Sequence, residues 1–295
     1  MATAAKKRRN KRAARRRKEL IAGVVVLSVI FVALLAVAVV LFRGQAPQTV
    51  AKPPMEPLPQ LQSQAKNPYS ASDFIAQDGR ITLRSGQGIA GIDVSRYQGD
   101  IDWQKVADSG VKFAFIRVGY RTYGSGEITA DPNAQANYRG AKAAGLKVGV
   151  YFFSQATTAL EAMEEADWTL RSIDGWQLDL PVVYDWELPA PDARTKDVTS
   201  GQLTAYTRIF NRILKNNGYT VMLYFNRHHA GVRLDMHRLL DMPHWFAMYA
   251  DEMTYPYDFA IWQYSQTGRV PGIQGDVDLN IMLPGNALWE ITTDN

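Results

Sequence analysis

The sequence predicts an α/β protein whose main body is an irregular (β/α) barrel of the TIM type with about eight strands. From residue 87 onward, apolar runs alternate with helical patterns, as expected where strands and helices alternate along a chain. Several runs contain almost no polar residue, which is typical of parallel strands covered on both faces. Helical patterns become sparse in the last third, so we expect the barrel to be irregular toward its end.

Composition divides the chain before the barrel. We expect a basic cytoplasmic tail over residues 1–19, a transmembrane helix over 20–42, a linker over 43–86 and the barrel over 87–290. Residues 20–42 carry no charge, and roughly 20 apolar residues suffice for a helix to cross the hydrocarbon core. The flank before this segment is densely positive, so the N terminus is expected in the cytoplasm and the barrel in the periplasm or outside the cell.

A cleaved signal peptide is the alternative interpretation of residues 20–42. Its apolar region usually runs for only about 7–15 residues and ends at a small-residue cleavage site. This apolar segment is longer and no clean site follows it, so the sequence favours an uncleaved anchor in the lipid bilayer.

The positive net charge of the whole chain comes from its beginning. Residues 1–43 hold eleven Lys and Arg and a single acid, whereas the rest holds 22 basic and 28 acidic side chains. The main body is therefore mildly acidic, and no nucleic-acid partner is expected. The chain has no cysteine, which excludes disulfides and thiolate chemistry.

Residues 43–86 are rich in Pro, Gln, Ala and Ser, as in a semi-extended linker. A flexible coil of this length would reach about 35 Å, enough to hold the barrel away from a bilayer. Within it, Phe74 to Leu83 contains apolar residues that are expected to pack on the barrel.

Strands and helices are expected in alternation through the barrel. Helices are predicted from an N-cap at Asp131 to a stop at Gly145, and from a capping box at Thr158 toward Ile173. A third helix ends at Gly218 and presents one apolar face, formed by Leu203, Tyr206, Phe210, Ile213 and Leu214. Strands are expected near 88–94, 112–118, 147–153, 180–184, 220–225, 244–249, 259–264 and 277–281.

The strongest candidate for catalytic chemistry is the segment from Pro181 to Pro189, which contains Asp185 and Glu187. Side chains two positions apart in a strand point to the same face, so both carboxyl groups are expected to project together. Neighbouring like charges push pKa values apart, which can leave one acid protonated and the other charged near neutral pH. The alternative is a strand end whose acids merely solvate a loop.

Other polar and aromatic residues fall near the expected strand ends, where (β/α) barrels carry their chemistry. Four acids together with several aromatics suit a sugar site, because aromatic rings stack on pyranose faces and carboxyl groups bind hydroxyls or protonate a leaving oxygen. Besides Asp185 and Glu187, the expected ring contains Asp93, Arg117, Tyr151, Tyr224, Tyr249, Trp262, Gln263 and Asp278.

A series of motifs resembles glycoside hydrolase family 25, whose members are lysozymes that act as N-acetylmuramidases on peptidoglycan. Residues 91–99 read Gly-Ile-Asp-Val-Ser-Arg-Tyr-Gln-Gly, and Ile-Asp-Trp follows at 101–103. The similarity covers about residues 88–283. Further matching residues are Phe115 to Arg117, Asp131 with Asn137, Ala144 to Leu146, Asp185 to Glu187, Trp245 to Tyr249, Trp262 to Tyr264 and Asp276 to Asn280.

The resemblance implies a barrel with fewer helices than strands. The third strand departs from the family, in which it often reads Tyr-His-Phe, because Phe152 stands where the family has His. Strand alternation places Phe152 and Tyr151 on opposite faces, so this change alters a supporting position or one subsite and removes no acid.

Residues and resemblance together predict hydrolysis of the β-1,4 bond between N-acetylmuramic acid and N-acetylglucosamine in peptidoglycan glycan strands. Glu187 is expected to be the general acid, and Asp185 to stay ionised. Asp185 would stabilise the oxocarbenium-like centre or orient the substrate's 2-acetamido group. Asp93 and Asp278 would bind substrate hydroxyls or tune Asp185 and Glu187. A chitin-type glycosidase and a catalytically silent peptidoglycan-binding tether remain the alternatives.

No cofactor and no metal are expected. His228, His229 and His237 lie close in sequence, but their spacing forms no metal triad on a helix face. The sequence does not specify an oligomeric state.

Overall fold

The computed structural model describes residues 64–295 except 189–191, 287, 289, 291 and 293–295. The chain divides into two units, Met1–Leu58 and Pro59–Asn295, and all the described residues belong to the second. The tail and membrane span expected at 1–19 and 20–42 lie outside the described residues. Within the described part, no helix has the length and apolar character needed to cross a membrane.

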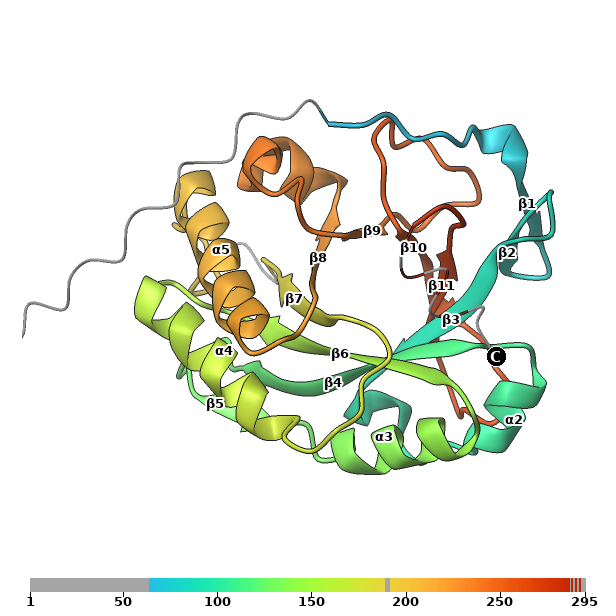
Figure 1. Cartoon of the computed structure of the whole chain (residues 1–295), viewed down its shortest axis with the longest axis horizontal. Helices are drawn as coiled ribbons and strands as arrows, with labels where there is room; N and C mark the ends of the chain where they lie inside the picture. Colours follow the sequence, from blue (N-terminus) through green and yellow to red (C-terminus); the bar gives the residue numbers. More distant parts are fainter. Residues whose placement is uncertain (1–63, 189–191, 287, 289, 291, 293–295) are drawn as a thin grey trace, which may run out of the picture. The chain divides into compact units, whose positions relative to one another are not determined.

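Eight strands of the main sheet close into a barrel, as expected (Figure 1). They pair in the order β3, β11, β10, β9, β8, β7, β6, β4, and the pairing of β3 with β4 closes the ring. A ninth strand, β5 (Ile128–Ala130), pairs with β4 at its outer side. The barrel strands are β3 (Ile89–Val94), β4 (Phe113–Arg121), β6 (Lys147–Ser154), β7 (Val182–Trp186), β8 (Val221–Asn226), β9 (His244–Ala247), β10 (Ile261–Gly268) and β11 (Val277–Met282).

The last strand, β11, runs opposite to its neighbours. It pairs antiparallel with both β10 and β3, whereas the other neighbouring pairs of barrel strands are parallel. Asp278 therefore lies near the amino end of its strand, where the sequence prediction had assumed a carboxyl end. The reversal still brings Asp278 to the mouth, because the beginning of β11 lies opposite the end of β3.

Among the described residues, the longer helices pack beside the barrel strands from β4 to β8 (Figure 1). The three predicted helices are confirmed as α3 (Ala134–Ala143), α4 (Ala159–Ser172) and α5 (Ser200–Asn216). A short helix that the sequence analysis did not predict, α2 (Trp103–Asp108), follows β3. The remaining helical turns are η1 (Ala71–Asp73), η2 (Arg96–Gln98), η3 (His229–Arg233) and η4 (Met236–Arg238).

The predicted helix starts are right for α4 and wrong for α3. Thr158 accepts a hydrogen bond from the backbone N–H of Glu161 at 3.1 Å and caps α4. The N-cap of α3 is Asn133, whereas the carboxylate of Asp131 forms an ion pair with Arg117. Asp131 was predicted as the N-cap because an Asp-Pro pair often begins a helix. Its Oδ1 accepts a hydrogen bond from the backbone N–H of Asn133 at 3.0 Å, just before the helix, while its Oδ2 is bound by the buried Arg117.

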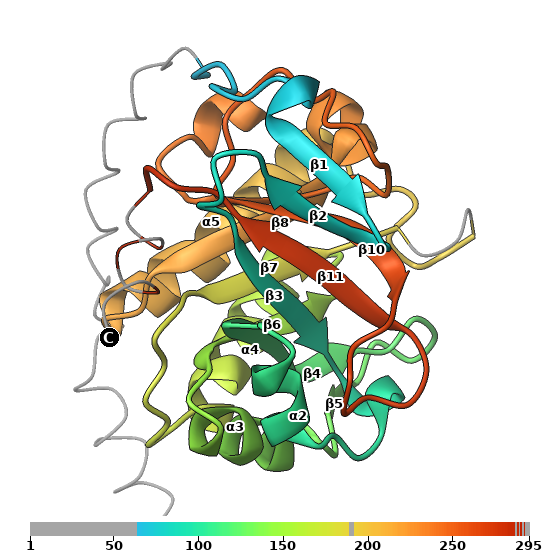
Figure 2. The same ribbon diagram turned by 90° about the vertical axis from the view of Figure 1, so that its right-hand side faces the viewer.

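A β-hairpin covers part of the barrel that has no helix (Figure 2). It consists of β1 (Phe74–Gln77) and β2 (Arg80–Leu83), within the range expected as linker. Phe74 packs edge-to-face on Trp262, with ring centroids 5.2 Å apart, and Ile81 is almost fully buried. The expectation that this segment packs on the barrel is confirmed, and folded structure extends before residue 87.

Large aromatic side chains fill the barrel interior below the mouth. Phe115 stacks on Trp245 with ring centroids 4.7 Å apart, and both are buried. The ring of Phe113 fills the space beside Gly91, where a Cβ atom would come within 2.1 Å of it. The interior is therefore a packed core, and polar chemistry is confined to its open end.

The hairpin anchor predicts a measurable loss of stability. Phe74→Ala should lower the free energy of unfolding by about 3 kcal/mol, because it removes a buried aromatic side chain and leaves a cavity against Trp262. Denaturant unfolding of the domain measures this change. Thr82→Ala on the exposed side of the same hairpin is the matched control and should change stability by less than about 0.5 kcal/mol. Equal effects of the two variants would show that the hairpin does not belong to the folded core.

Candidate active site

Four carboxyl groups gather at the mouth of the barrel. Asp93 near the end of β3 and Asp278 near the start of β11 are direct register partners. Asp185 lies on β7 and Glu187 directly follows this strand. Asp93, Glu187 and Asp278 each raise the pKa of at least one other member of the group.

Strand alternation places Asp185 and Trp186 on opposite faces of β7. Trp186 points outward, where its indole N–H donates to the carbonyl of Ala156 and its ring packs against His229. Asp185 faces the interior, and the charge of Glu187 raises its pKa. The predicted same-face placement of Asp185 and Glu187 is therefore what the structure has.

Asp93 is held by two side-chain amides. Its Oδ2 accepts hydrogen bonds from Nε2 of Gln263 and from Nδ2 of Asn280, each at 2.8 Å. Asn280 in turn accepts a hydrogen bond from the indole N–H of Trp245 at 2.8 Å. Sequence reasoning missed Asn280 as a site residue, although its position two residues after Asp278 on a strand could have indicated the shared face.

Gln263 joins Asp93 to two tyrosines. Its Oε1 accepts hydrogen bonds from the hydroxyls of Tyr224 at 2.8 Å and Tyr249 at 3.1 Å. Tyr224 is buried, whereas the side chain of Tyr249 is about half exposed. Gln263 is buried as well, so of these three side chains Tyr249 is the one that is open to a ligand.

Burial is the main reason that the pKa values of all four acids are raised. It raises the pKa of Asp93 to about 6, that of Glu187 to about 7 and that of Asp278 to about 9, and carboxylates nearby add to the effect on Glu187 and Asp278. The hydroxyl of Tyr224 opposes the rise at Glu187.

The pKa of Asp185 is also raised well above its usual value, first by burial and then by Glu187 and Asp93. The sequence prediction that Asp185 stays ionised while Glu187 alone is protonated is therefore too simple. Oδ1 of Asp185 is buried and accepts no hydrogen bond from the described residues. This oxygen is the one unsatisfied carboxyl atom among the buried atoms of the four acids in the described part of the chain.

Arg117 acts on the site through charge. It is buried in an ion pair with Asp131 at 2.8 Å, and its positive charge lowers the pKa of Asp185 against the other effects. Its guanidinium lies 5.1 Å from the ring centroids of both Tyr97 and Tyr120. Neither tyrosine was predicted as a site residue, although Tyr97 lies within the motif at 91–99.

Tyr151 on β6 belongs to the same mouth. Its ring packs edge-to-face on Trp245, and burial raises the pKa of its hydroxyl, with smaller contributions from Asp93 and Asp185. This placement matches its predicted place in the ring.

Trp262 does not line the mouth, and its prediction as a substrate-binding residue is wrong. Its side chain is fully buried on the outer face of β10, between Phe74 and Tyr264. Its indole N–H donates to the carbonyl of Met248 at 2.8 Å. Neighbouring residues in a strand face opposite sides, so Gln263 faces inward and Trp262 cannot do so as well.

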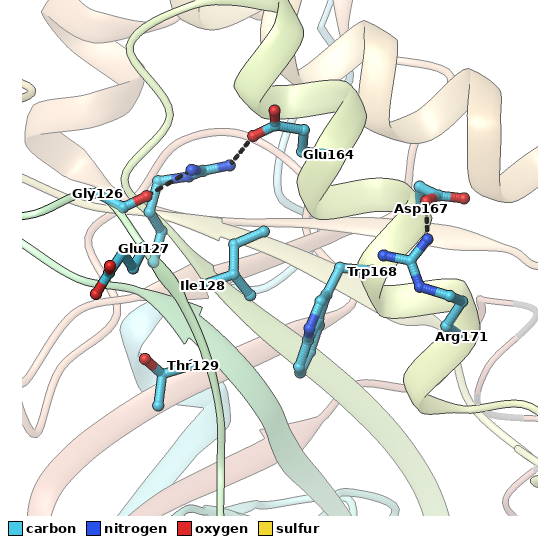
Figure 3. Close-up of a pocket in the computed structure, with 9 residues that line it drawn as sticks. Gly126, Glu127, Ile128, Thr129, Glu164, Asp167, Trp168 and Arg171 are labelled. Atoms are coloured by element: carbon cyan, nitrogen blue, oxygen red, sulfur yellow. Dashed lines mark hydrogen bonds and ion pairs between the residues drawn. The ribbon is translucent and has the colours of Figure 1, made fainter. Parts of the chain in front are cut away.

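A separate depression of about 610 Å³ lies between β5 and α4 (Figure 3). None of the four acids lines it, and its own acids are Glu127, Glu164 and Asp167. Asp167 forms an ion pair with Arg171 on the same helix, and Glu164 accepts a hydrogen bond from Arg121. Of these charged groups, Glu164 thus connects α4 to Arg121 of β4.

The histidines do not form a metal site. In the part of the chain that the structure describes, no three His, Asp, Glu or Cys side chains are placed to hold a metal ion. His229 is buried against Trp186, and this burial lowers its pKa to about 4.

The fold and the acidic mouth define a glycoside-hydrolase barrel. The chain belongs to the family described as Glycosyl hydrolases family 25, which it matches over residues 92–273. It is 32% identical over 206 residues to Lysozyme M1 of Streptomyces globisporus, a match that spans 65% of this chain and 67% of that protein.

Two solved structures are also similar to the chain. The bacterial lysozyme from Streptomyces coelicolor is 27% identical with a TM-score of 0.53, over 70% of this chain and 97% of that one. The modular autolysin LytC from Streptococcus pneumoniae is 26% identical with a TM-score of 0.60, over 71% of this chain. The match spans about half of the LytC chain, 52%.

The buried acids predict a pH-dependent effect on stability. An unfolded Glu ionises near about pH 4, whereas Glu187 in the folded protein holds its proton up to about 7. Between these pH values the unfolded state releases the proton while the folded state keeps it, so Glu187 lowers stability as the pH rises from about 4 to about 7.

Glu187→Gln removes this titration. Relative to the unaltered protein, the variant should gain about 2 kcal/mol more stability at about pH 8 than at about pH 4. Denaturant unfolding at the two pH values measures the difference. Glu252→Gln, which replaces an exposed acid, is the control and should show the same stability difference at both. A gain that did not change with pH would contradict the burial of the Glu187 charge.

Proposed function

We propose that this protein hydrolyses the β-1,4 bond between N-acetylmuramic acid and N-acetylglucosamine in peptidoglycan glycan strands. The observation that carries the proposal is the position of Glu187 beside Asp185 at the barrel mouth, with a pKa of Glu187 near neutrality. Membership of Glycosyl hydrolases family 25 and similarity to proteins named lysozymes support the choice of substrate.

Glu187 is the general acid. With a pKa raised to about 7, it is largely protonated at the pH where unperturbed carboxyl groups are charged. It donates this proton to the glycosidic oxygen as the bond between that oxygen and the anomeric carbon breaks. The resulting carboxylate then accepts a proton from the water molecule that completes hydrolysis.

Asp185 acts on the other side of the reaction, and two roles are open to it. It either stabilises the positive charge at the anomeric carbon directly or accepts the N–H of the 2-acetamido group, so that the acetamido oxygen attacks that carbon. The buried and unpartnered Oδ1 of Asp185 supports the second role, because a substrate N–H would supply the missing hydrogen bond. This role requires the ionised form of Asp185, which burial and the neighbouring acids oppose and the charge of Arg117 favours.

The remaining residues of the site are proposed to bind the sugars or to shift the pKa of Glu187. Asp93 is already engaged by Gln263 and Asn280, so it contributes mainly through its charge, which raises the pKa of Glu187. Asp278, Tyr151, Tyr224 and Tyr249 are the groups proposed to contact sugar hydroxyls and ring faces.

We also propose that residues 20–42 anchor the protein in a lipid bilayer as a single-pass span. The support is the charge-free apolar segment and the positive flank before it. The N terminus would lie in the cytoplasm and the barrel in the periplasm or outside the cell.

Activity of the acid is tested with Glu187→Gln. The variant keeps the shape of the side chain but cannot donate the proton, so kcat should fall by about 10²–10⁴-fold. The assay measures reducing ends released from purified peptidoglycan, with mass analysis of the sugar at each new end. Glu252→Gln is the matched control and should keep the full rate. The rate of the unaltered protein should decline as the pH rises through about 7, since Glu187 then loses its proton.

Other outcomes identify other functions. A native rate for Glu187→Gln would show that another group is the acid. Faster turnover of a chitin oligomer than of peptidoglycan would indicate a chitin-type glycosidase. Co-sedimentation of the unaltered protein with sacculi without any new reducing ends would indicate a silent tether.

The anchor is tested by fractionation. The full chain should sediment with membranes and resist extraction by high salt or carbonate, because about 20 buried apolar residues hold it in the bilayer. A chain that begins at residue 64 should remain in the supernatant. Recovery of the full chain as a shortened supernatant form would instead show a cleaved signal peptide.

A further inference from the structure

We propose that the N-terminal hairpin and the loop after β9 form an additional saccharide-binding site, which holds sugars of the same glycan strand beyond the bond to be cleaved. This inference rests on the proposed function. The hairpin that forms one side lies outside residues 92–273, the part that matches the family.

A cavity of about 510 Å³ opens between three segments of the chain. Residues 76–81 of the hairpin form one side, residues 249–251 after β9 form the second, and residues 264–267 of β10 form the third. Cavities of about 300–1,000 Å³ are the usual size of ligand sites. The space is therefore large enough for one or two sugar rings.

The cavity shares a wall with the catalytic mouth. Tyr249 lines it, and the hydroxyl of the same residue donates to Gln263, which holds Asp93. Tyr249 therefore connects the two, and a glycan that leaves the mouth past this residue would enter the cavity. The half-exposed ring of Tyr249 offers the kind of surface on which a pyranose stacks.

The hairpin side of the cavity is preformed. A two-residue turn joins β1 to β2, and both of its residues have positive φ, 52° for Asp78 and 73° for Gly79. This geometry is that of the tight hairpin turn which matches the twist of the strands. Phe74 and Ile81 fix the hairpin on the barrel, so a ligand would meet a rigid wall and lose little free energy in ordering it.

The side chains around the cavity suit a neutral, hydroxyl-rich ligand. Uncharged hydrogen-bonding groups dominate, supplied by Gln77, Ser265, Gln266 and Thr267. Asp78 and Asp251 outnumber Arg80, whose guanidinium also donates to the carbonyl of Ser109. This balance disfavours the carboxylate-bearing peptides of peptidoglycan and favours the sugar backbone itself.

The test uses full-length protein that carries Glu187→Gln, so that ligands bind without being cleaved. Ala250→Trp places an indole in the cavity from an exposed loop position. The probes are peptide-free peptidoglycan glycans whose lactyl carboxyl groups are capped as amides and therefore uncharged, one a disaccharide and one an octasaccharide, and the same octasaccharide with its peptides. Ala250→Trp should raise the Kd of the peptide-free octasaccharide about tenfold and leave that of the disaccharide within about twofold.

Two further variants keep this test decisive. Gln266→Ala removes one exposed hydrogen-bonding group and should raise the same Kd by about threefold without filling the cavity. Thr82→Trp, on the hairpin strand but outside the cavity lining, is the matched control and should bind like the parent. An unchanged octasaccharide Kd in both Ala250→Trp and Gln266→Ala would overturn the proposal. A loss limited to the peptide-bearing glycan would also overturn it, since it would identify a peptide site.

Failure of this proposal can be told apart from failure of the proposed function. The release of reducing ends by the unaltered protein tests hydrolysis, whereas the binding series is measured without catalysis. Length-dependent binding without any hydrolysis would leave the cavity site standing and remove the hydrolase. Hydrolysis together with binding that does not depend on the cavity would support the proposed function and remove the cavity site.

Discussion

Enclosure of four carboxyl groups in one mouth is the constraint on which the rest of this structure depends. Each acid would be charged in water at neutral pH, but burial and mutual repulsion oppose ionisation of all four at once. The mouth therefore retains protons near pH 7, one of which is available on Glu187. The folded state tolerates these groups because amides bind Asp93 and the charge of Arg117 acts on Asp185.

The reversed last strand makes this enclosure possible. A parallel strand in the place of β11 would bring its carboxyl end to the mouth, whereas the antiparallel β11 brings its beginning there, with Asp278 opposite Asp93. The same strand places Asn280 where it donates to Asp93 and accepts from Trp245. The buried aromatic floor is thereby connected to Asp93 through a single amide.

The hairpin covers outer strand surface that the helices of this fold leave uncovered. A barrel with few helices leaves the outer faces of its late strands uncovered, and Trp262 would there be exposed to water. Phe74 and its hairpin cover that surface. Because the turn of the hairpin also borders the cavity beside Tyr249, one segment can serve both packing and ligand binding.

The sequence alone determined the features that depend on local patterns: the eight strands, the three main helices, and the placement of Asp185 and Glu187 on one face, since strand and helix periods are set by neighbouring residues. Only the tertiary structure decided which face of a strand is inside. It turned Gln263 inward and Trp262 outward, and paired the carboxylate of Asp131 with Arg117. It also brought Asn280 to Asp93 from 187 positions away in the chain. Such choices depend on which distant groups share a buried space, and no local pattern of residues records that.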